Sequence, residues 1–346
     1  MTVSDEEQGS VGRPSGPSAT QQAGVAGENP RGTQMSSVET GRVPDFFIVG
    51  HHKSGTTALY QMLKRHPQIF MPALKEPKFF ATDLPARLEP PAAGKLPGTL
   101  EEYLALFADA EPGQRAGEAS PSYLRSHAAA GEIAAVNPDA RIIAILREPA
   151  GFVRSMHLEL VQSHVETEKD LGTALAGEDV VRAGRHMRRY SDHVRYAEQV
   201  RRYHDTFGPD RVLVLIYDDF RNDNEATVRR VLRFLDVDDT APVEVIEANP
   251  TVSVRSIRLD KTVRALYEGR GPVARVLKSA VKAVAPEQVR RGALHAVRRR
   301  LVYGKPQSPD ERVMADLRRR FKPEVVAIGD YLKRDLFALW GYDSVD

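Results

Sequence analysis

The stretch DFFIVGHHKSGTTAL, residues 45–59, decides the fold of this chain. It begins with an apolar run of strand length that ends at Gly50, and it finishes with apolar residues at helical spacing. A short loop of small residues with one lysine, Lys53, lies between them. In such a connection the N–H groups of the loop and of the first helical turn point to one place and can bind a phosphate. Gly55 lets the backbone approach the anion because it has no Cβ atom, so the stretch predicts an anion-binding loop.

The order of residues in this loop excludes two common phosphate motifs. A Walker A loop has its lysine directly after the second glycine, whereas Lys53 stands two residues before Gly55. The G-x-G-x-x-G pattern of dinucleotide-binding loops is also absent from this stretch. An ordinary strand–loop–helix connection is the plain alternative.

A second segment has the same character. The run RIIAIL, residues 141–146, follows an Asn-Pro-Asp turn and is typical of a buried parallel strand. It continues into Arg147, Glu148 and Pro149, and Ser155 comes eight residues after Arg147. Arginine offers planar bidentate donors to a phosphate, and a hydroxyl on the next helix can add one bond. The plain alternative is an ion pair between Arg147 and Glu148.

Together the two segments resemble the sulfotransferases that use 3′-phosphoadenosine 5′-phosphosulfate. The loop KSGTT is similar to their 5′-phosphosulfate loop, and the strand–Arg–x–Pro–helix arrangement is similar to their 3′-phosphate site. The resemblance implies that the 3′-phosphate is bound by Arg147 and Ser155, with weaker support for Lys305 after Gly304. It implies that the 5′-phosphate is bound by Lys53, Ser54, Gly55, Thr56 and Thr57.

Three further stretches fit this family. The run KEPKFF, residues 75–80, resembles an element of the glycan-type enzymes, which implies that Glu76 is the general base. Residues 117–124 resemble the segment that supports the acceptor side, and residues 190–219 resemble the long helix, strand and acidic turn that close the core. The resemblance covers most of residues 46–219 and continues weakly over 306–340.

One position departs from the heparan-type enzymes. They carry a lysine at their sulfuryl centre where this chain has Ala119. Lys53, Lys75 or another cation must then supply the charge, or the mechanism depends less on it.

The reaction implied by the resemblance is sulfuryl transfer to an acceptor hydroxyl by in-line displacement, with no metal required. Glu76 would take the proton of the acceptor. Lys53 would stabilise the charge that grows on the leaving phosphate, and positioning would supply much of the rest. The acceptor hydroxyl stays open between a glycan, a glycolipid and a secondary metabolite.

The order of the predicted elements indicates an α/β protein. Strands are expected at 45–49, 114–118, 141–146 and 211–217, and helices at 56–65, 100–107, 150–164, 182–206, 224–235, 309–320 and 323–338. This alternation predicts a P-loop-like three-layer fold, a mainly parallel sheet with helices on both faces. Ligands of such sheets bind at the carboxyl ends of the strands, where both anion motifs stand.

Composition suggests the domain organisation. Residues 1–43 contain no Leu, Ile or aromatic residue and are expected to be a disordered tail, followed by one sulfotransferase domain at 44–346. We find no secretory h-region and no run of 18 apolar residues. The chain has no cysteine, which excludes disulfides and thiolate metal sites. A cytoplasmic location is expected, because the donor is made inside cells.

Charge is concentrated between residues 255 and 305, where fourteen Lys or Arg residues stand against three acids. Apolar residues at roughly helical spacing make this stretch a basic, partly amphipathic helical insertion or lid, with possible peripheral contact to an anionic membrane. A solvated face or a positive rim that attracts the donor is the alternative. We expect no nucleic-acid partner, since aromatic residues are few here and no recognition motif is evident.

Two other functions are alternatives to sulfuryl transfer. Residues 212–219, VLVLIYDD, loosely resemble a Walker B strand with a magnesium-binding aspartate, as in a nucleotide kinase. A catalytically silent nucleotide-binding protein that docks on membranes through 255–305 is the second alternative. If Glu76 is not the base, His157 and His164 come next. Trp340 and Tyr342 are expected to be packing anchors.

Overall fold

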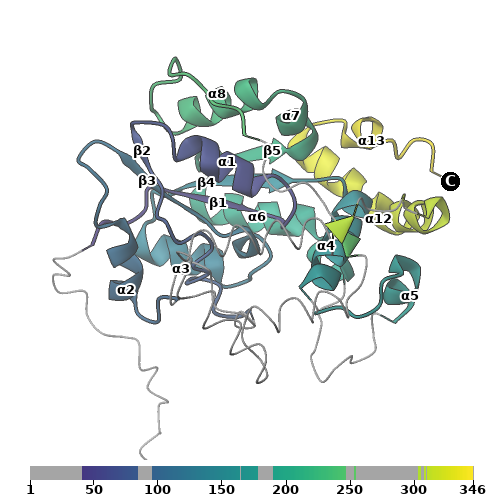
Figure 1. The fold of residues 1–346 in the computed structure, drawn as a ribbon. Coiled ribbons are helices and arrows are strands. Elements are labelled where there is room, and N and C mark those ends of the chain that lie inside the picture. The colour runs from purple at the N-terminus through teal and green to yellow at the C-terminus, as the bar shows by residue number, and fades with distance from the viewer. Residues whose placement is uncertain are drawn as a thin grey trace, which may run out of the picture. The chain divides into compact units, whose positions relative to one another are not determined.

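Strand β1, Phe46–Gly50, lies at the centre of a five-stranded sheet with the order β2-β3-β1-β4-β5 (Figure 1). The other strands are β2 (Ile69–Phe70), β3 (Arg115–Ala119), β4 (Arg141–Leu146) and β5 (Val212–Ile216), and all four pairings are parallel. The computed structural model describes residues 41–84, 96–163, 165–177, 190–246, 253–254, 303–304, 308 and 310–345. All of these belong to one unit, Thr40–Asp346.

Helices cover both faces of the sheet, as Figure 1 shows. The strand residues alternate between two cores, because successive side chains of a strand point to opposite faces. Phe46 and Ile48 pack with α1 and α8, and Phe47 and Val49 pack with α3, α4, α6 and α12. The three-layer α/β fold expected from the sequence is therefore confirmed.

The helices have the following bounds. They are α1 (Thr56–Leu63), α2 (Leu100–Leu104), α3 (Ala129–Val136), α4 (Pro149–Gln162), α5 (Leu171–Ala176), α6 (Tyr196–Phe207), α7 (Tyr217–Asn222), α8 (Asn224–Phe234), α12 (Glu311–Leu332) and α13 (Leu336–Leu339). Short 3₁₀ helices occur at Ala105–Phe107, Pro121–Tyr123, Tyr190–His193 and Pro209–Arg211.

A separate strand pair lies beside α4. Strand β6, Ser253–Val254, pairs antiparallel with β7, Tyr303–Gly304, and β6 packs against α4. The residues that separate the two strands lie outside the described residues, and so do Lys305 and the predicted tail up to residue 40. The predictions for the basic insertion and the tail therefore remain predictions.

Two helix predictions were wrong. The range 182–206 is not one helix in its described part, because Tyr190–His193 is a 3₁₀ turn and α6 begins only at Tyr196. This break brings the His193 carbonyl to 3.0 Å from His51 Nε2. The ranges 309–320 and 323–338 are largely one helix, α12, which runs through Pro323. Its buried face continues on both sides of the proline, so packing outweighs the lost hydrogen bond.

Candidate active site

The loop after β1 is shaped to receive an anion. Lys53 and Gly55 both have positive φ, 65° and 87°, and no side chain caps the start of α1. The first N–H groups of that helix therefore lack intrahelical acceptors. Ser54 Oγ is fully buried and has no hydrogen-bond partner among the described residues. A buried hydroxyl is normally satisfied, so this atom also points to a ligand.

Two glycines fix the position of this loop. A Cβ on Gly50 would lie 2.7 Å from the Ile145 carbonyl oxygen, so β1 can end beside β4 only with a glycine. A Cβ on Gly55 would lie 2.9 Å from Phe220 and 3.3 Å from Tyr217. Helix α7, which carries these two rings, therefore packs directly on the anion loop.

Arg147 connects the second predicted motif to the first. It follows β4, and its Nη1 donates to the Lys53 carbonyl at 2.6 Å. Its guanidinium lies 4.7 Å from the centre of the Tyr217 ring. Glu148 does not pair with it but caps α4, accepting from Ala150 N at 2.9 Å and Gly151 N at 2.5 Å. The structure thus brings the two anion motifs together at the carboxyl edge of the sheet.

The other predicted 3′-phosphate residues are less defined. Ser155 lies on α4, about two turns from its start, and is almost fully buried. Lys305 is outside the described residues, although β7 ends just before it and its partner β6 packs on α4. Both assignments stay predictions.

Glu76 lies in the loop after β2, in a strained conformation with φ 59°. Lys75 Nζ donates to its Oε1 at 2.7 Å, and Lys78 Nζ lies 3.8 Å from Oε2. Burial favours the neutral acid, but the positive charges of His52 (when protonated), Lys75 and Lys78 outweigh it and lower the pKa of Glu76 to about 2. Glu76 is therefore ionised and held in an ion pair with Lys75, an arrangement we call the lysine clamp.

The end of β3 holds this loop in place. Glu76 N donates to the Ala119 carbonyl at 3.2 Å, Lys78 N donates to Ser120 Oγ at 3.2 Å, and Phe80 N donates to Tyr123 Oη at 3.3 Å. The 117–124 segment therefore contacts the loop that carries Glu76. Ala119, where the resemblance to the heparan-type enzymes implies a lysine, supplies a buried methyl group, and Lys75 and Lys78 place positive charge beside Glu76.

The strand that supports this loop carries an acid that the sequence motifs did not single out. Glu118 is fully buried in β3, and its Oε2 accepts from Tyr103 Oη at 2.7 Å and Tyr123 Oη at 3.0 Å. Burial raises its pKa to about 7, against the effect of these hydrogen bonds. An isolated glutamate in a strand flanked by small residues was the available signal.

His51 and His157 make hydrogen bonds that connect separate parts of the fold. His51 Nε2 donates to the His193 carbonyl and to Gln199 Oε1 at 3.1 Å, and burial lowers the pKa of this histidine to about 3. His157 joins Tyr190 Oη at 3.0 Å and the Lys169 carbonyl at 3.1 Å, so both of its nitrogens are engaged. His164 lies outside the described residues.

The two aspartates of the Walker B-like stretch are also engaged. Trp340 Nε1 donates to Asp218 Oδ2 at 2.9 Å. Arg334 donates two hydrogen bonds to Asp219, at 2.5 and 2.7 Å. Both carboxylates hold the C-terminal segment, which does not support the kinase hypothesis.

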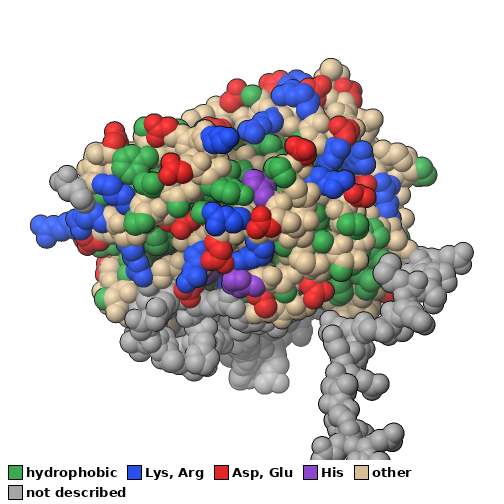
Figure 2. Space-filling view, turned by 180° about the vertical axis from the view of Figure 1, so that it is seen from behind, with side chains coloured by type: hydrophobic (Ala, Val, Ile, Leu, Met, Phe, Trp, Pro, Cys, Tyr) green, Lys and Arg blue, Asp and Glu red, His purple; other side chains and the backbone are tan. Residues whose placement is uncertain are grey.

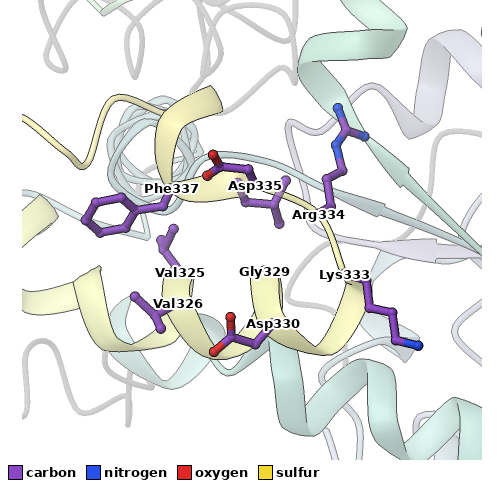
Figure 3. A pocket seen from close by; sticks show the side chains of 9 residues that line it. Val325, Val326, Gly329, Asp330, Lys333, Arg334, Asp335 and Phe337 are labelled. Carbon is purple, nitrogen blue, oxygen red and sulfur yellow. The ribbon is translucent and has the colours of Figure 1, made fainter.

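Two of the hollows formed by the described residues lie outside these loops. The larger, about 570 Å³, is bordered by the end of α12 and by α13 (Figure 3). The smaller, about 260 Å³, is polar and lies at the start of α6; its lining includes Arg125, Arg195 and Arg202 together with Asp192 and Glu198. Charges of both signs also mix over the described part of the face in Figure 2.

Known proteins agree with this arrangement. The profile of the Sulfotransferase family matches residues 44–241, which include both anion motifs and Glu76. The chain belongs to the sulfotransferase family. A sulfotransferase from Alicyclobacillus acidocaldarius has a similar structure, with a TM-score of 0.60 and 26% identity over 86% of this chain and 98% of that one.

A curated relative matches a smaller part of the chain. Heparan sulfate glucosamine 3-O-sulfotransferase 3A1 of Homo sapiens is 28% identical over 149 residues, which are 41% of this chain and 32% of the relative. The chain thus spans about a third of the length of that sulfotransferase. Among the described helices, none is long and apolar enough to cross a bilayer.

Proposed function

We propose that this chain transfers a sulfuryl group from 3′-phosphoadenosine 5′-phosphosulfate to an acceptor hydroxyl. The observation that carries the proposal is the 2.6 Å hydrogen bond from Arg147 to the Lys53 carbonyl. It joins two cationic motifs from separate strand ends, as a donor with two phosphate groups requires. The buried, unpartnered Ser54 Oγ and the uncapped start of α1 supply further bonds for the 5′-phosphate.

In this reaction the acceptor oxygen forms a bond to sulfur while the bond from sulfur to the bridging phosphate oxygen breaks. Lys53 stabilises the charge on that leaving oxygen. Its ammonium group is paired with no side chain in the described part of the chain, so it is available to the donor. The proton of the acceptor passes to Glu76.

The clamp on Glu76 has a mechanistic consequence. A carboxylate with a pKa near 2 is a weak base, since an effective base has a pKa near the working pH. When an acceptor hydroxyl takes the place of Lys75 at Oε1, the loss of this contact raises the pKa of the carboxylate. The released lysine can then approach the sulfuryl group, in the role that Ala119 cannot fill.

The donor test is calorimetry with adenosine 3′,5′-bisphosphate, without magnesium, beside ATP with magnesium. We expect the bisphosphate to bind and ATP to bind more weakly. Failure of the bisphosphate to bind contradicts the proposal, and binding without turnover over a broad acceptor panel indicates a catalytically silent protein. Transfer of radiolabelled sulfate to cell extract would identify the acceptor, whether a glycan, a lipid-linked glycan or a small molecule.

Location and membrane contact are proposed separately. We propose that the protein is cytoplasmic and that its basic stretch 255–305 contacts anionic lipid. The reason is that fourteen Lys or Arg residues stand against three acids in this stretch. Co-sedimentation with anionic vesicles should fall as salt is raised, and it should weaken when Arg298, Arg299 and Arg300 are changed to Ser. Binding that ignores lipid charge and salt would remove this proposal.

A further inference from the structure

We propose that the C-terminal segment 334–342 completes the donor site, with Arg334, Trp340 and Tyr342 as positioning residues for Arg147. This inference rests on the proposed function, because it assigns Arg147 to the 3′-phosphate of the donor. It goes beyond the packing role expected for Trp340 and Tyr342.

The first contact supports the residue next to Arg147. Tyr342 is fully buried, and its Oη donates to Glu148 Oε1 at 2.7 Å. Glu148 in turn accepts from the first N–H groups of α4, Ala150 and Gly151. Tyr342 therefore fixes the turn from β4 into α4, where the backbone of Arg147 leaves the sheet.

The other two contacts support the aromatic ring beside Arg147. Asp218 and Asp219, which Trp340 and Arg334 bind, directly follow Tyr217 at the start of α7. The Tyr217 ring faces the Arg147 guanidinium and packs on Gly55 of the anion loop. Figure 3 shows Arg334 pointing away from Lys333 and Asp330, which lie on the opposite side of the helix end.

Arg147 is thus held from two directions by one short segment. One path runs from Tyr342 through Glu148, and the other runs from Trp340 and Arg334 through the start of α7. The segment also contributes apolar rings to the core, since Trp340 is nearly buried and Tyr342 fully so. A test must therefore remove the polar contacts and keep the rings.

The variants are Tyr342→Phe, Arg334→Gln and the two combined. The matched control is Tyr331→Phe, because Tyr331 Oη also bonds a side chain, His204 Nδ1 at 2.9 Å, but contacts neither path. Calorimetry gives each protein's affinity for adenosine 3′,5′-bisphosphate and for adenosine 5′-monophosphate. The ratio of the two affinities isolates the 3′-phosphate, and thermal unfolding verifies the fold.

In the unmodified protein we expect a ratio of roughly tenfold to a hundredfold, as for a charge-assisted phosphate contact. In the double variant the ratio should fall about threefold to tenfold, with little change in monophosphate affinity. Arg334→Lys keeps one charged hydrogen bond to Asp219, so its affinity ratio should lie between those of the unmodified protein and the double variant. Tyr331→Phe should leave the ratio unchanged.

An unchanged ratio in a folded double variant, or equal losses for both nucleotides, would overturn the positioning role and leave a purely structural one. If the double variant does not fold, the single Tyr342→Phe decides by the same ratio. A protein that binds neither nucleotide before any substitution would instead refute the proposed function.

Discussion

The two halves of the site differ in how their charges are paired. On the donor side, the Arg147 guanidinium meets a backbone carbonyl and an aromatic ring, so its charge is available to an anion. On the acceptor side, Glu76 is already paired with Lys75 and approached by Lys78. The donor side therefore presents its charge to an anion, whereas on the acceptor side an ion pair with Lys75 lowers the basicity of Glu76.

The two halves also differ in how their loops are held. Both contain non-glycine residues at positive φ, Lys53 on one side and Glu76 and Lys78 on the other. Such a conformation costs on the order of 1–3 kcal/mol per residue. The Glu76 loop offsets that cost with three hydrogen bonds to residues 119–123, at and just after the end of β3. The Lys53 loop is held by Arg147, a residue that is itself predicted to bind the 3′-phosphate of the donor.

The largest expected effect comes from the acceptor side. Glu76→Gln should lower kcat by roughly 10²–10⁴-fold, because the amide cannot take the proton of the acceptor. Affinity for adenosine 3′,5′-bisphosphate should stay within about twofold. The measurement is steady-state turnover beside calorimetry, with the exposed Glu132→Gln as control. Turnover close to that of the unmodified protein would mean that another group is the base.

Glu118 should make stability depend on pH. Its folded-state pKa, about 7, is above the ordinary 4.5, so its contribution is fully present below pH 4.5 and is lost as pH rises toward 7. The full difference is about 3 kcal/mol. Glu118→Gln keeps an acceptor for Tyr103 and Tyr123 and should flatten the profile. Urea unfolding from pH 5 to 8 measures this, and parallel profiles for the two proteins would contradict it.

On the donor side, the expected effect is a loss of affinity for the nucleotide. Arg147→Ala should weaken adenosine 3′,5′-bisphosphate about tenfold to a hundredfold, since a charge-assisted contact contributes about 1.5–3 kcal/mol. Arg211→Ala, which removes a surface ion pair with Asp139, is the matched control. Unchanged affinity in a folded Arg147→Ala protein would reject the assignment of the 3′-phosphate site.

The smallest effect tests the lysine clamp. Lys75→Gln removes one of the charges that lower the pKa of Glu76, so the acid limb of kcat/KM should move to higher pH. The sign follows because a raised pKa means that Glu76 becomes protonated, and inactive as a base, at a higher pH. The control is Lys64→Gln, which changes an exposed lysine at the C-terminal end of α1. An acid limb that does not move would show that Lys75 does not set this pKa.

The sequence predicted the sheet well because local signals were strong. The apolar runs ending at Gly50 and Leu146 predicted β1 and β4, and the anion loops were predicted from the residues that follow these runs. Strand β2 has only two residues and was missed, since so short a run carries no periodicity. Helix α7 was also not predicted, because it starts directly after β5 and no turn residues separate the two.

The supporting contacts could not be predicted. Tyr342 meets Glu148 across 194 residues of sequence, and Arg334 meets Asp219 across 115. Nothing near Asp218 and Asp219 indicates that they bind a tryptophan and an arginine rather than a metal. Pro323 gave the opposite error, because a strong local signal for a helix end was overridden by the buried face of α12.

The central position of β1 also affects synthesis on the ribosome. Gly50 pairs with Ile145, and Phe46 with Gly117, so neither neighbouring strand exists when β1 leaves the exit tunnel. At about 5–20 residues per second, the 95 residues from His51 to Ile145 take roughly 5–19 s to make. Until β3 is made the apolar run Phe-Phe-Ile-Val has no partner strand, and until β4 is made one of its edges stays unpaired. Unpaired edges of this kind are prone to aggregation. The stretch that leads into the predicted donor site is thus exposed to misfolding while the protein is being made.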